Sequence, residues 1–188
     1  MILIHGRGAT AEDILSLSAP LSYAGLAYLA PQAEGYTWYP NRFIFPVEQN
    51  EPYLSGALAK VDSIVKEIES HGISSEKIFI GGFSQGACLA SEYVIRNPKK
   101  YGGLFVFSGG YIGALNQERE PNGDLQNTPV FIGCSDIDPH IPLQRVQETT
   151  TLLKAMNAQV TERIYPNMGH TINDEEIALA NEIIQKSL

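Results

Sequence analysis

Short apolar runs alternate along the chain with longer stretches in which hydrophobic residues recur at helical spacing. The apolar runs are rich in β-branched and aromatic side chains, a composition typical of strands that are covered on both faces. The predicted strands are residues 2–5, 26–30, 77–81, 104–107, 130–133 and 160–165.

Between these runs the pattern predicts amphipathic helices. The clearest covers residues 52–71, and Gly72 supplies a stop signal. Its apolar stripe has spacings of four and three and consists of Leu54, Leu58, Val61, Val65 and Ile68. A second helix is predicted over residues 87–95. A third helix is predicted to follow Asn173, a good N-cap residue. Its residues expected to face the core are Ile177, Ala180, Ile183 and Ile184.

The regular alternation of strand and helix predicts an α/β fold, with a doubly wound, mostly parallel sheet of about six strands flanked by helices. The 188 residues suit a single domain spanning 1–188. Two long irregular stretches remain, residues 31–50 and 108–128, and loops of this length are often functional. The first is rich in aromatic residues and is either a wall of a substrate pocket or packing over the sheet edge. The second is polar and is interpreted as a modest cap or plain surface.

Composition narrows the range of partners. The net charge of −8 argues against a nucleic-acid groove or an anionic membrane surface. No apolar run reaches the roughly 18 residues of a transmembrane helix, and the first four residues lead directly into His5 without a basic leader, so no signal peptide is expected. Cys88 and Cys134 suggest no disulfide framework, and together these features predict a cytoplasmic protein.

The segment Gly82-Phe83-Ser84-Gln85-Gly86 fits the Gly-x-Ser-x-Gly nucleophile elbow. A predicted strand precedes it and a predicted helix follows it, which is the context that the motif requires. Side chains at Gly82 and Gly86 would collide with neighbouring backbone in so tight a turn. We therefore expect Ser84 to be a nucleophile held in a strained conformation at the top of the sheet.

A serine nucleophile needs a base, and in this fold the chain order is serine, acid, histidine. His170 follows the last predicted strand and is the expected base. Met168, in the same loop, is expected to bind substrate. His71 closes a helix and is expected at the surface. His140 is expected to line the pocket or to make a structural hydrogen bond.

Two aspartates follow the strand at residues 130–133, and spacing alone leaves both Asp136 and Asp138 open as the acid. Asp136 is also suited to capping the turn through its own backbone. A metal site built from His5, Asp136, His140 and His170 is a weaker alternative, because no metal-ligand spacing motif is present. We therefore expect no metal.

An oxyanion hole requires two backbone N–H groups that point at the developing negative charge. Gln85, which follows the nucleophile, is expected to supply one. The second is expected from Arg7, in the glycine-containing loop after the first strand, where Gly6 lets the backbone approach a substrate closely.

These residues together resemble the carboxylesterase/phospholipase family of α/β-hydrolases, which includes acyl-protein thioesterases, lysophospholipases and small bacterial carboxylesterases. The matching segments are residues 5–9, 82–86, 138–142 and 169–170. The resemblance implies that the catalytic acid is Asp138, the aspartate before proline. It also implies that Trp38 and Tyr39 lie beside the acyl pocket. Relatives carry one or two strands before the His-Gly strand, so the sheet is expected to lack these first strands.

The expected activity is hydrolysis of carboxylic esters of small to medium acyl groups by Ser84, His170 and Asp138, without a cofactor. The expected partner is a small-molecule ester, and the resemblance implies a monomer or homodimer. An acyl-protein thioesterase or lysophospholipase with a long-chain pocket is the first alternative. A non-catalytic ligand-binding protein on a hydrolase scaffold is the second.

Overall fold

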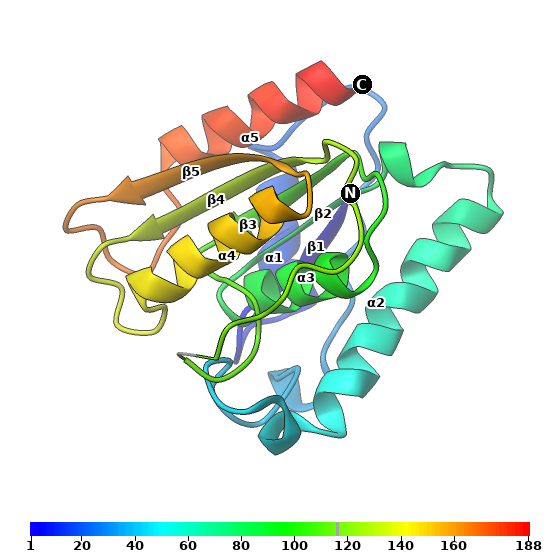
Figure 1. Cartoon of the computed structure of the whole chain (residues 1–188). Helices are drawn as coiled ribbons and strands as arrows, with labels where there is room; N and C mark the ends of the chain where they lie inside the picture. The colour runs from blue at the N-terminus through cyan, green and yellow to red at the C-terminus, as the bar shows by residue number, and fades with distance from the viewer. Residues whose placement is uncertain (116) are drawn as a thin grey trace.

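The computed structural model describes residues 1–115 and 117–188, and a five-stranded parallel sheet lies at its centre (Figure 1). The strands lie side by side in chain order as β1 (Ile2–Ile4), β2 (Phe79–Phe83), β3 (Gly103–Phe107), β4 (Pro129–Ser135) and β5 (Gln159–Tyr165). Each connection therefore returns the chain to the same end of the sheet, as parallel strands require.

Five of the predicted strands are confirmed, with boundaries shifted by one or two residues. The predicted strand at residues 26–30 is wrong. This segment makes one isolated bridge to the outer edge of β1, where Leu29 pairs with Ile2. Leu29 is 46% exposed, so the segment is not buried on both faces. Small alanines offer little surface to bury, and Pro31, which follows, has no N–H for a ladder.

Helices cover both faces of the sheet. One face is covered by α2 (Tyr53–Ser70), α3 (Gln85–Arg96) and α4 (Leu143–Ala155), and the other by α1 (Ala11–Leu15) and α5 (Asp174–Ser187) (Figure 1). Both faces are thus covered as predicted, although the strand order has no reversal. Short 3₁₀ turns complete the chain at Ser16–Ser18, Glu34–Tyr36, Val47–Asn50 and Ser75–Lys77.

Alternation along the strands divides the hydrophobic core into two layers. Ile80 and Val106 face α2, α3 and α4, whereas Phe79, Phe105 and Phe107 face α1 and α5. The predicted apolar stripe of α2 is buried at Leu54, Leu58, Val61 and Val65, and Ile68 packs partly buried against the same layer. Each face of the sheet is therefore covered by its own hydrophobic layer.

The carboxyl ends of the strands meet at one edge of the sheet. In the register, Ile4 of β1 pairs with Gly82 of β2, and Phe83 pairs with Phe107 of β3. Further across, Ser135 of β4 pairs with Tyr165 of β5. The loops after these strands are therefore neighbours, and in α/β proteins this edge is where ligands bind.

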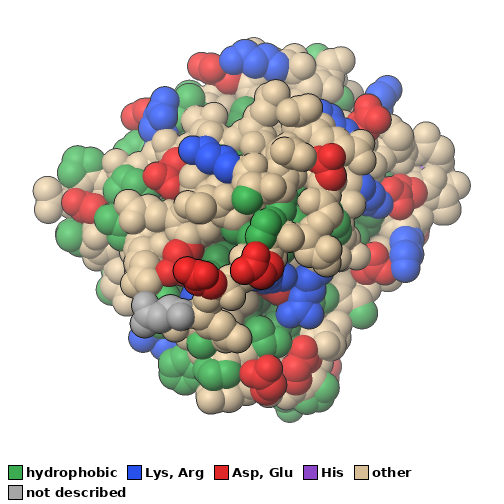
Figure 2. Space-filling model, viewed as in Figure 1, with side chains coloured by type: hydrophobic (Ala, Val, Ile, Leu, Met, Phe, Trp, Pro, Cys, Tyr) green, Lys and Arg blue, Asp and Glu red, His purple; other side chains and the backbone are tan. Residues whose placement is uncertain are grey.

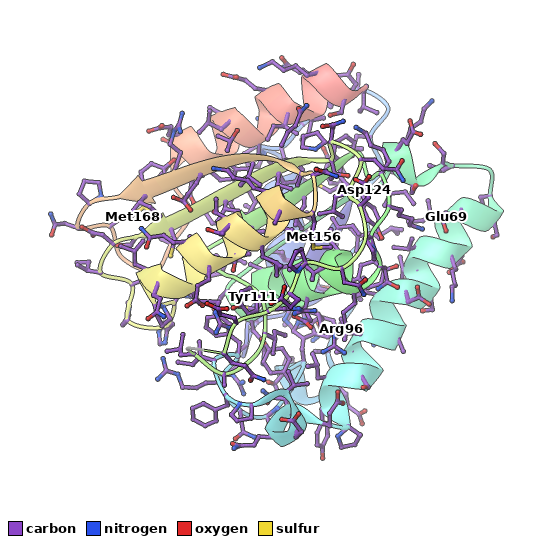
Figure 3. All side chains as sticks on the ribbon, viewed as in Figure 1. Glu69, Arg96, Tyr111, Asp124, Met156 and Met168 are labelled. Atoms are coloured by element: carbon purple, nitrogen blue, oxygen red, sulfur yellow. The ribbon has the colours of Figure 1, made fainter. Side chains whose placement is uncertain are left out.

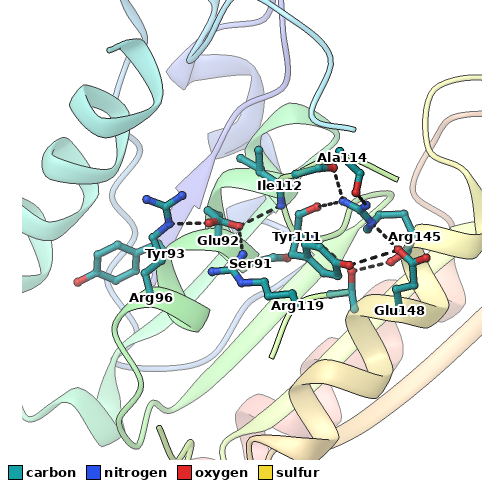
Figure 4. A network of polar contacts seen from close by, with 12 residues as sticks. Ser91, Glu92, Tyr93, Arg96, Tyr111, Ile112, Ala114, Arg119, Arg145 and Glu148 are labelled. Carbon is teal, nitrogen blue, oxygen red and sulfur yellow. Dashed lines mark hydrogen bonds and ion pairs between the residues drawn. The ribbon is translucent and has the colours of Figure 1, made fainter. Parts of the chain in front are cut away.

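Two buried charged side chains hold the second long loop, residues 108–128 (Figure 4). Glu92 of α3 accepts hydrogen bonds from the Ile112 N–H at 3.0 Å and from Arg119 at 2.7 Å. Arg145 of α4 donates to three carbonyl oxygens of residues 111–114. Because a buried charge is costly unless it is paired, these contacts fix the loop against α3 and α4.

Tyr111 lies between α3 and α4 in Figure 3, and the guanidinium of Arg145 stacks 4.0 Å from the centre of its ring. Tyr111 and Ile112 are both buried. The interpretation of this loop as a polar cap or plain surface is therefore wrong for its first part. The local sequence does not predict the burial of Tyr111 and Ile112, because the charged side chains that bind this loop, Glu92 and Arg145, belong to α3 and α4.

Acidic and basic side chains are interspersed over the face in Figure 2, without a large area of a single sign. The excess of 21 acidic over 13 basic residues is thus distributed rather than concentrated on this face. No helix in residues 1–115 or 117–188 has both the length and the apolar character needed to cross a bilayer.

Helix α5 begins with a capping box whose glutamate is fully buried. Asn173 and Glu176 exchange backbone-to-side-chain hydrogen bonds, as the predicted N-cap requires. The second carboxylate oxygen of Glu176 has no hydrogen-bond partner among the described residues. Burial raises the pKa of Glu176 to about 7, although its hydrogen bond with Asn173 acts in the opposite direction.

We predict that Glu176→Gln makes the free energy of unfolding less dependent on pH, because glutamine has no carboxyl group to deprotonate. The folded protein binds the proton more tightly than the unfolded chain does, so stability is fully present at low pH and falls as pH rises through about 7. The free energy of unfolding, measured by urea denaturation, is expected to fall by about 2–3 kcal/mol more in the wild type than in the variant between about pH 5 and pH 8.

Glu182→Gln is the matched control, because Glu182 is an exposed carboxylate further along α5 and is not among the groups that shift the pKa of Glu176. It is expected to retain the wild-type dependence on pH. Equal slopes for the wild type and Glu176→Gln would show that Glu176 does not titrate in this range.

Candidate active site

Ser84 lies at the sharp turn between β2 and α3. Its backbone has φ +55° and ψ −119°, a strained conformation for a residue with a side chain. A Cβ atom at Gly86 would lie 2.0 Å from the Ile4 carbonyl oxygen, and one at Gly82 would lie 2.5 Å from the Gly86 carbonyl carbon. The two glycines are therefore required by backbone contact, as the motif predicts.

Backbone contacts fix the position of the serine. The Ser84 N–H donates to the Phe107 carbonyl oxygen at 3.0 Å, and the Ser84 carbonyl oxygen accepts from the Cys88 N–H at 3.0 Å. Ser84 is thus tied both to β3 and to the first turn of α3. The positive end of the helix dipole lies directly behind it.

His170 and Asp138 form a charge-assisted pair. The Nδ1–H of His170 donates to Asp138 Oδ2 at 2.6 Å. Asp138 Oδ1 accepts from the backbone N–H groups of His140 and Ile141, at 2.8 and 3.0 Å. Burial acts to raise the pKa of the Asp138 carboxyl, but the hydrogen bonds from His170, His140 and Ile141 outweigh it and hold the pKa below its usual range.

The imidazole of His170 is held between two other rings. Its centroid lies 4.7 Å from that of Phe83 and 4.9 Å from that of His140, which meets it edge to face. Both contacts, and the bond to Asp138, restrict rotation of the His170 ring. Ser84 and His170 line the same cavity, and no hydrogen bond joins them in the part of the chain that is described.

Asp136 supports the neighbouring loop. Its Oδ1 accepts from the Asn167 N–H at 2.8 Å, and its own N–H donates to the Tyr165 carbonyl oxygen at 3.1 Å. It therefore caps the turn that leads to His170, rather than a turn of its own backbone. Of the two aspartates that spacing left open, Asp138 is the one in contact with His170.

The backbone N–H groups of Arg7 and Gln85 make no hydrogen bond to a described residue. Gln85 is the first residue of α3, so its N–H lacks a helical partner. Arg7 is held in a turn in which Gly8 has φ +77° and donates to the Tyr36 carbonyl oxygen. Both N–H groups are available to bind a developing anion.

The side chains of Gln85 and Arg7 hold one segment, residues 36–41, which we call the wall segment. Gln85 accepts from the Trp38 N–H at 3.0 Å and donates to the Tyr39 carbonyl oxygen at 2.8 Å. Arg7 donates to the carbonyl oxygens of residues 39, 40 and 41. The two expected oxyanion residues and the wall segment are thus one hydrogen-bonded unit.

Ser84 and His170 open into a cavity of about 540 Å³ beside the wall segment. Three of the residues expected to bind substrate, Gly6, Tyr39 and His140, line it. The other lining residues are Arg7, Ala9, Pro40, Asn41, Arg42, Phe43, Phe45, Phe83, Gln85, Cys88 and Ile141. Its volume lies within the range of small-molecule sites.

The other two expected substrate-binding residues do not line this cavity. Trp38 belongs to the wall segment, but its side chain is buried against the end of β1, where the indole N–H donates to the His5 carbonyl oxygen at 2.8 Å. Met168 lies in the loop beyond β5 (Figure 3), and its sulfur accepts from the Asn173 side chain. Sequence reasoning did not single out Arg42 or Cys88, although Arg42 lies within the long aromatic stretch.

His5 and the wall segment are linked on the side away from the cavity. The Nε2 atom of His5 accepts from the Ala33 N–H at 3.1 Å, and its Nδ1–H donates to the Gly6 carbonyl oxygen. His5 therefore stabilises the loop that carries Arg7. Among the described residues, no three His, Cys, Asp or Glu side chains gather in an arrangement that could hold a metal ion.

The sequence profile of the phospholipase/carboxylesterase family matches residues 1–188. The chain belongs to this family. A phospholipase/carboxylesterase from Dyadobacter fermentans has a similar structure, with a TM-score of 0.93 and 49% identity over 98% of this chain and 88% of that one. The carboxylesterase of Bacillus cereus, at 20% identity and a TM-score of 0.79 over 100% and 88% of the two chains, shares the fold. The fold is the α/β-hydrolase fold.

Curated members of the family include acyl-protein thioesterase 1 of Saccharomyces cerevisiae. It is 34% identical over 136 residues, which cover 70% of this chain and 59% of that protein. The protein of the same name from Kluyveromyces lactis is 30% identical over 139 residues, covering 72% and 60%. The chain spans about three fifths of the length of these relatives.

We predict that Gln85→Met loosens the wall segment. Methionine has a similar length but leaves the buried Trp38 N–H without its partner. It also removes one donor from the Tyr39 carbonyl oxygen, which still accepts from Arg7 and Thr37. The free energy of unfolding is expected to fall by about 1–2 kcal/mol, because one buried N–H group loses its hydrogen bond. Urea denaturation measures the change.

Gln147→Met is the matched control, since Gln147 is exposed on α4. Its effect is expected to stay within about 0.5 kcal/mol. An equally small effect in Gln85→Met would show that the Gln85 side chain does not hold the wall.

Proposed function

We propose that this protein is a serine hydrolase that cleaves carboxylic esters through an acyl-enzyme intermediate. The observation that carries the proposal is the 2.6 Å pair of His170 and Asp138, which opens on the same cavity as the strained Ser84. An acid–histidine pair beside an elbow serine is the arrangement that nucleophilic catalysis requires. The names of the relatives support the same class of chemistry.

In the first half-reaction, Ser84 Oγ bonds to the ester carbonyl carbon and its proton passes to His170 Nε2. Asp138 fixes the imidazole through Nδ1 and offsets the charge that the imidazolium gains. The carbonyl oxygen becomes an anion, which the N–H groups of Arg7 and Gln85 stabilise. When the carbonyl–oxygen bond breaks, His170 returns the proton to the departing alcohol.

In the second half-reaction, water attacks the acyl carbon and gives a proton to His170. The bond to Ser84 Oγ then breaks, the serine recovers that proton, and the carboxylic acid leaves. His170 therefore acts as base and acid in turn. Apart from the ester and water, the proposed steps use only groups of this chain.

The proposed substrates are esters of small to medium acyl groups. Aromatic and aliphatic side chains make up one side of the cavity, including Phe43, Phe45 and Ile141. The alternative is a long-chain thioester or lysophospholipid, and the names of the curated relatives favour the thioester. The proposed location is the cytoplasm, with which the free, buried Cys88 and Cys134 are compatible.

Hydrolysis of p-nitrophenyl esters from acetate to palmitate tests the function. We predict turnover that is highest for short and medium chains, and a fall in kcat of at least about 10³-fold in Ser84→Ala with an unchanged melting temperature. The control is Ser63→Ala, an exposed serine on α2. A maximum at palmitate would favour the long-chain alternative, and no turnover of any ester would favour a binding protein.

A second prediction separates the two aspartates. Asp138→Asn is expected to lower kcat by about 10³–10⁴-fold, because the amide cannot stabilise the imidazolium and favours the wrong tautomer of His170. Asp136→Asn keeps an oxygen for the Asn167 N–H and is expected to change kcat by less than about threefold. Steady-state kinetics on p-nitrophenyl acetate measures both variants, and equal losses would contradict the assignment of Asp138.

A further inference from the structure

The catalytic cavity differs in charge from the rest of the chain. The chain has 21 acidic and 13 basic residues and a net charge of −8. The cavity is lined by Arg7 and Arg42, and by none of the acidic residues that the structure describes. A bound anion would therefore meet two cations and no carboxylate side chain on the cavity wall.

The two arginines differ in how their donors are used. Arg7 donates to three backbone carbonyl oxygens of the wall segment, so three of its five N–H donors are used. Arg42 is exposed, and its side chain makes one contact of 3.4 Å, to the carbonyl oxygen of His140. Neither arginine has a carboxylate partner among the described residues. Arg42 thus retains most of its five N–H donors.

The backbone beneath Arg42 is fixed. The buried Asn50 donates to the Arg42 carbonyl oxygen and accepts from the Asn41 N–H at 2.8 Å. The next residue is also held, because the Phe43 carbonyl oxygen accepts from the Gly113 N–H at 2.8 Å. A long cationic side chain therefore extends from a rigid platform at the cavity.

The contact with the His140 carbonyl oxygen brings the Arg42 side chain to the loop after β4, which also lines the cavity. His140 follows Asp138 in the loop after β4, and its ring packs against His170. The guanidinium thus lies between the wall of the cavity and the loop that carries the acid. A group bound there would be part of the same substrate whose ester reaches Ser84.

We propose that Arg42 binds a carboxylate of the substrate, and that the natural substrates are esters which carry a free carboxylate near the scissile bond. This inference rests on the proposed esterase function. A planar guanidinium offers a fork of two parallel N–H donors, which matches the two oxygens of a carboxylate. A phosphate dianion is less well matched, because Arg7 already uses three of its five N–H donors on the wall segment and leaves no free fork beside Arg42.

The test compares esters that differ in one charge. The first pair is monomethyl glutarate and methyl pentanoate, in which the charge lies on the acyl part. The second pair is 4-acetoxybenzoate and 4-acetoxybenzamide, in which it lies on the leaving group. In at least one pair, the wild type is expected to prefer the anionic ester by about tenfold in kcat/KM at low salt, the effect of one charged hydrogen-bonded contact.

Arg42→Gln is expected to reduce this preference to about twofold or less, while Arg42→Lys keeps the charge without the fork and retains part of it. Lys154→Gln, which removes an exposed charge at the end of α4, is the control and is expected to keep the wild-type preference. The wild-type preference should also decline as salt rises, since the site is exposed to solvent.

Each outcome decides the proposal. Equal kcat/KM values within both pairs would overturn it, as would a preference that survives in Arg42→Gln. Free glutarate and inorganic phosphate are compared as competitive inhibitors, and stronger inhibition by phosphate would overturn the carboxylate assignment. If neutral esters are cleaved without a charge preference, the esterase proposal stands alone. If no ester is cleaved, the esterase proposal itself fails.

Discussion

The structure depends on the contact between the first turn of α3 and the end of β1. Gly86 passes so close to Ile4 that a single added carbon would overlap the Ile4 carbonyl oxygen. This contact draws α3 tightly under the sheet edge and forces Ser84 into its positive-φ conformation. The position of Ser84 is therefore a consequence of backbone packing and not of contacts made by its own side chain.

A second consequence of that contact is that the proposed oxyanion residues, Arg7 and Gln85, are both bonded to the wall segment. Because α3 starts beside β1, Gln85 and Arg7 lie near each other although they are far apart in the sequence. Both use their side chains on the wall segment, so the groups that would stabilise charge and the groups that would hold substrate are positioned together. Such second contacts are what keep a site rigid enough for catalysis.

Buried charge is used elsewhere in the fold to fix segments without regular structure. Glu92 and Arg145 hold the loop after β3, and each is satisfied by several partners. Glu176 is different, since one oxygen has no partner among the described residues and the protonated form is favoured. The cost of its burial is offset by the cap that it provides for α5, next to the loop of His170.

The sequence by itself determined the strand–helix alternation, five of the strands, the elbow at Ser84 and the identity of His170 as the histidine after the last strand. These follow from local composition and from motifs whose residues are adjacent. The family resemblance implied Asp138 as the acid, but spacing left Asp136 open, and tertiary structure shows that Asp138 is the aspartate in contact with His170. Tertiary structure alone decided that residues 26–30 are not a strand and that Trp38 does not line the cavity. It also brought Arg42 to the cavity. Each of these depends on contacts between segments distant in the chain, which no local pattern records.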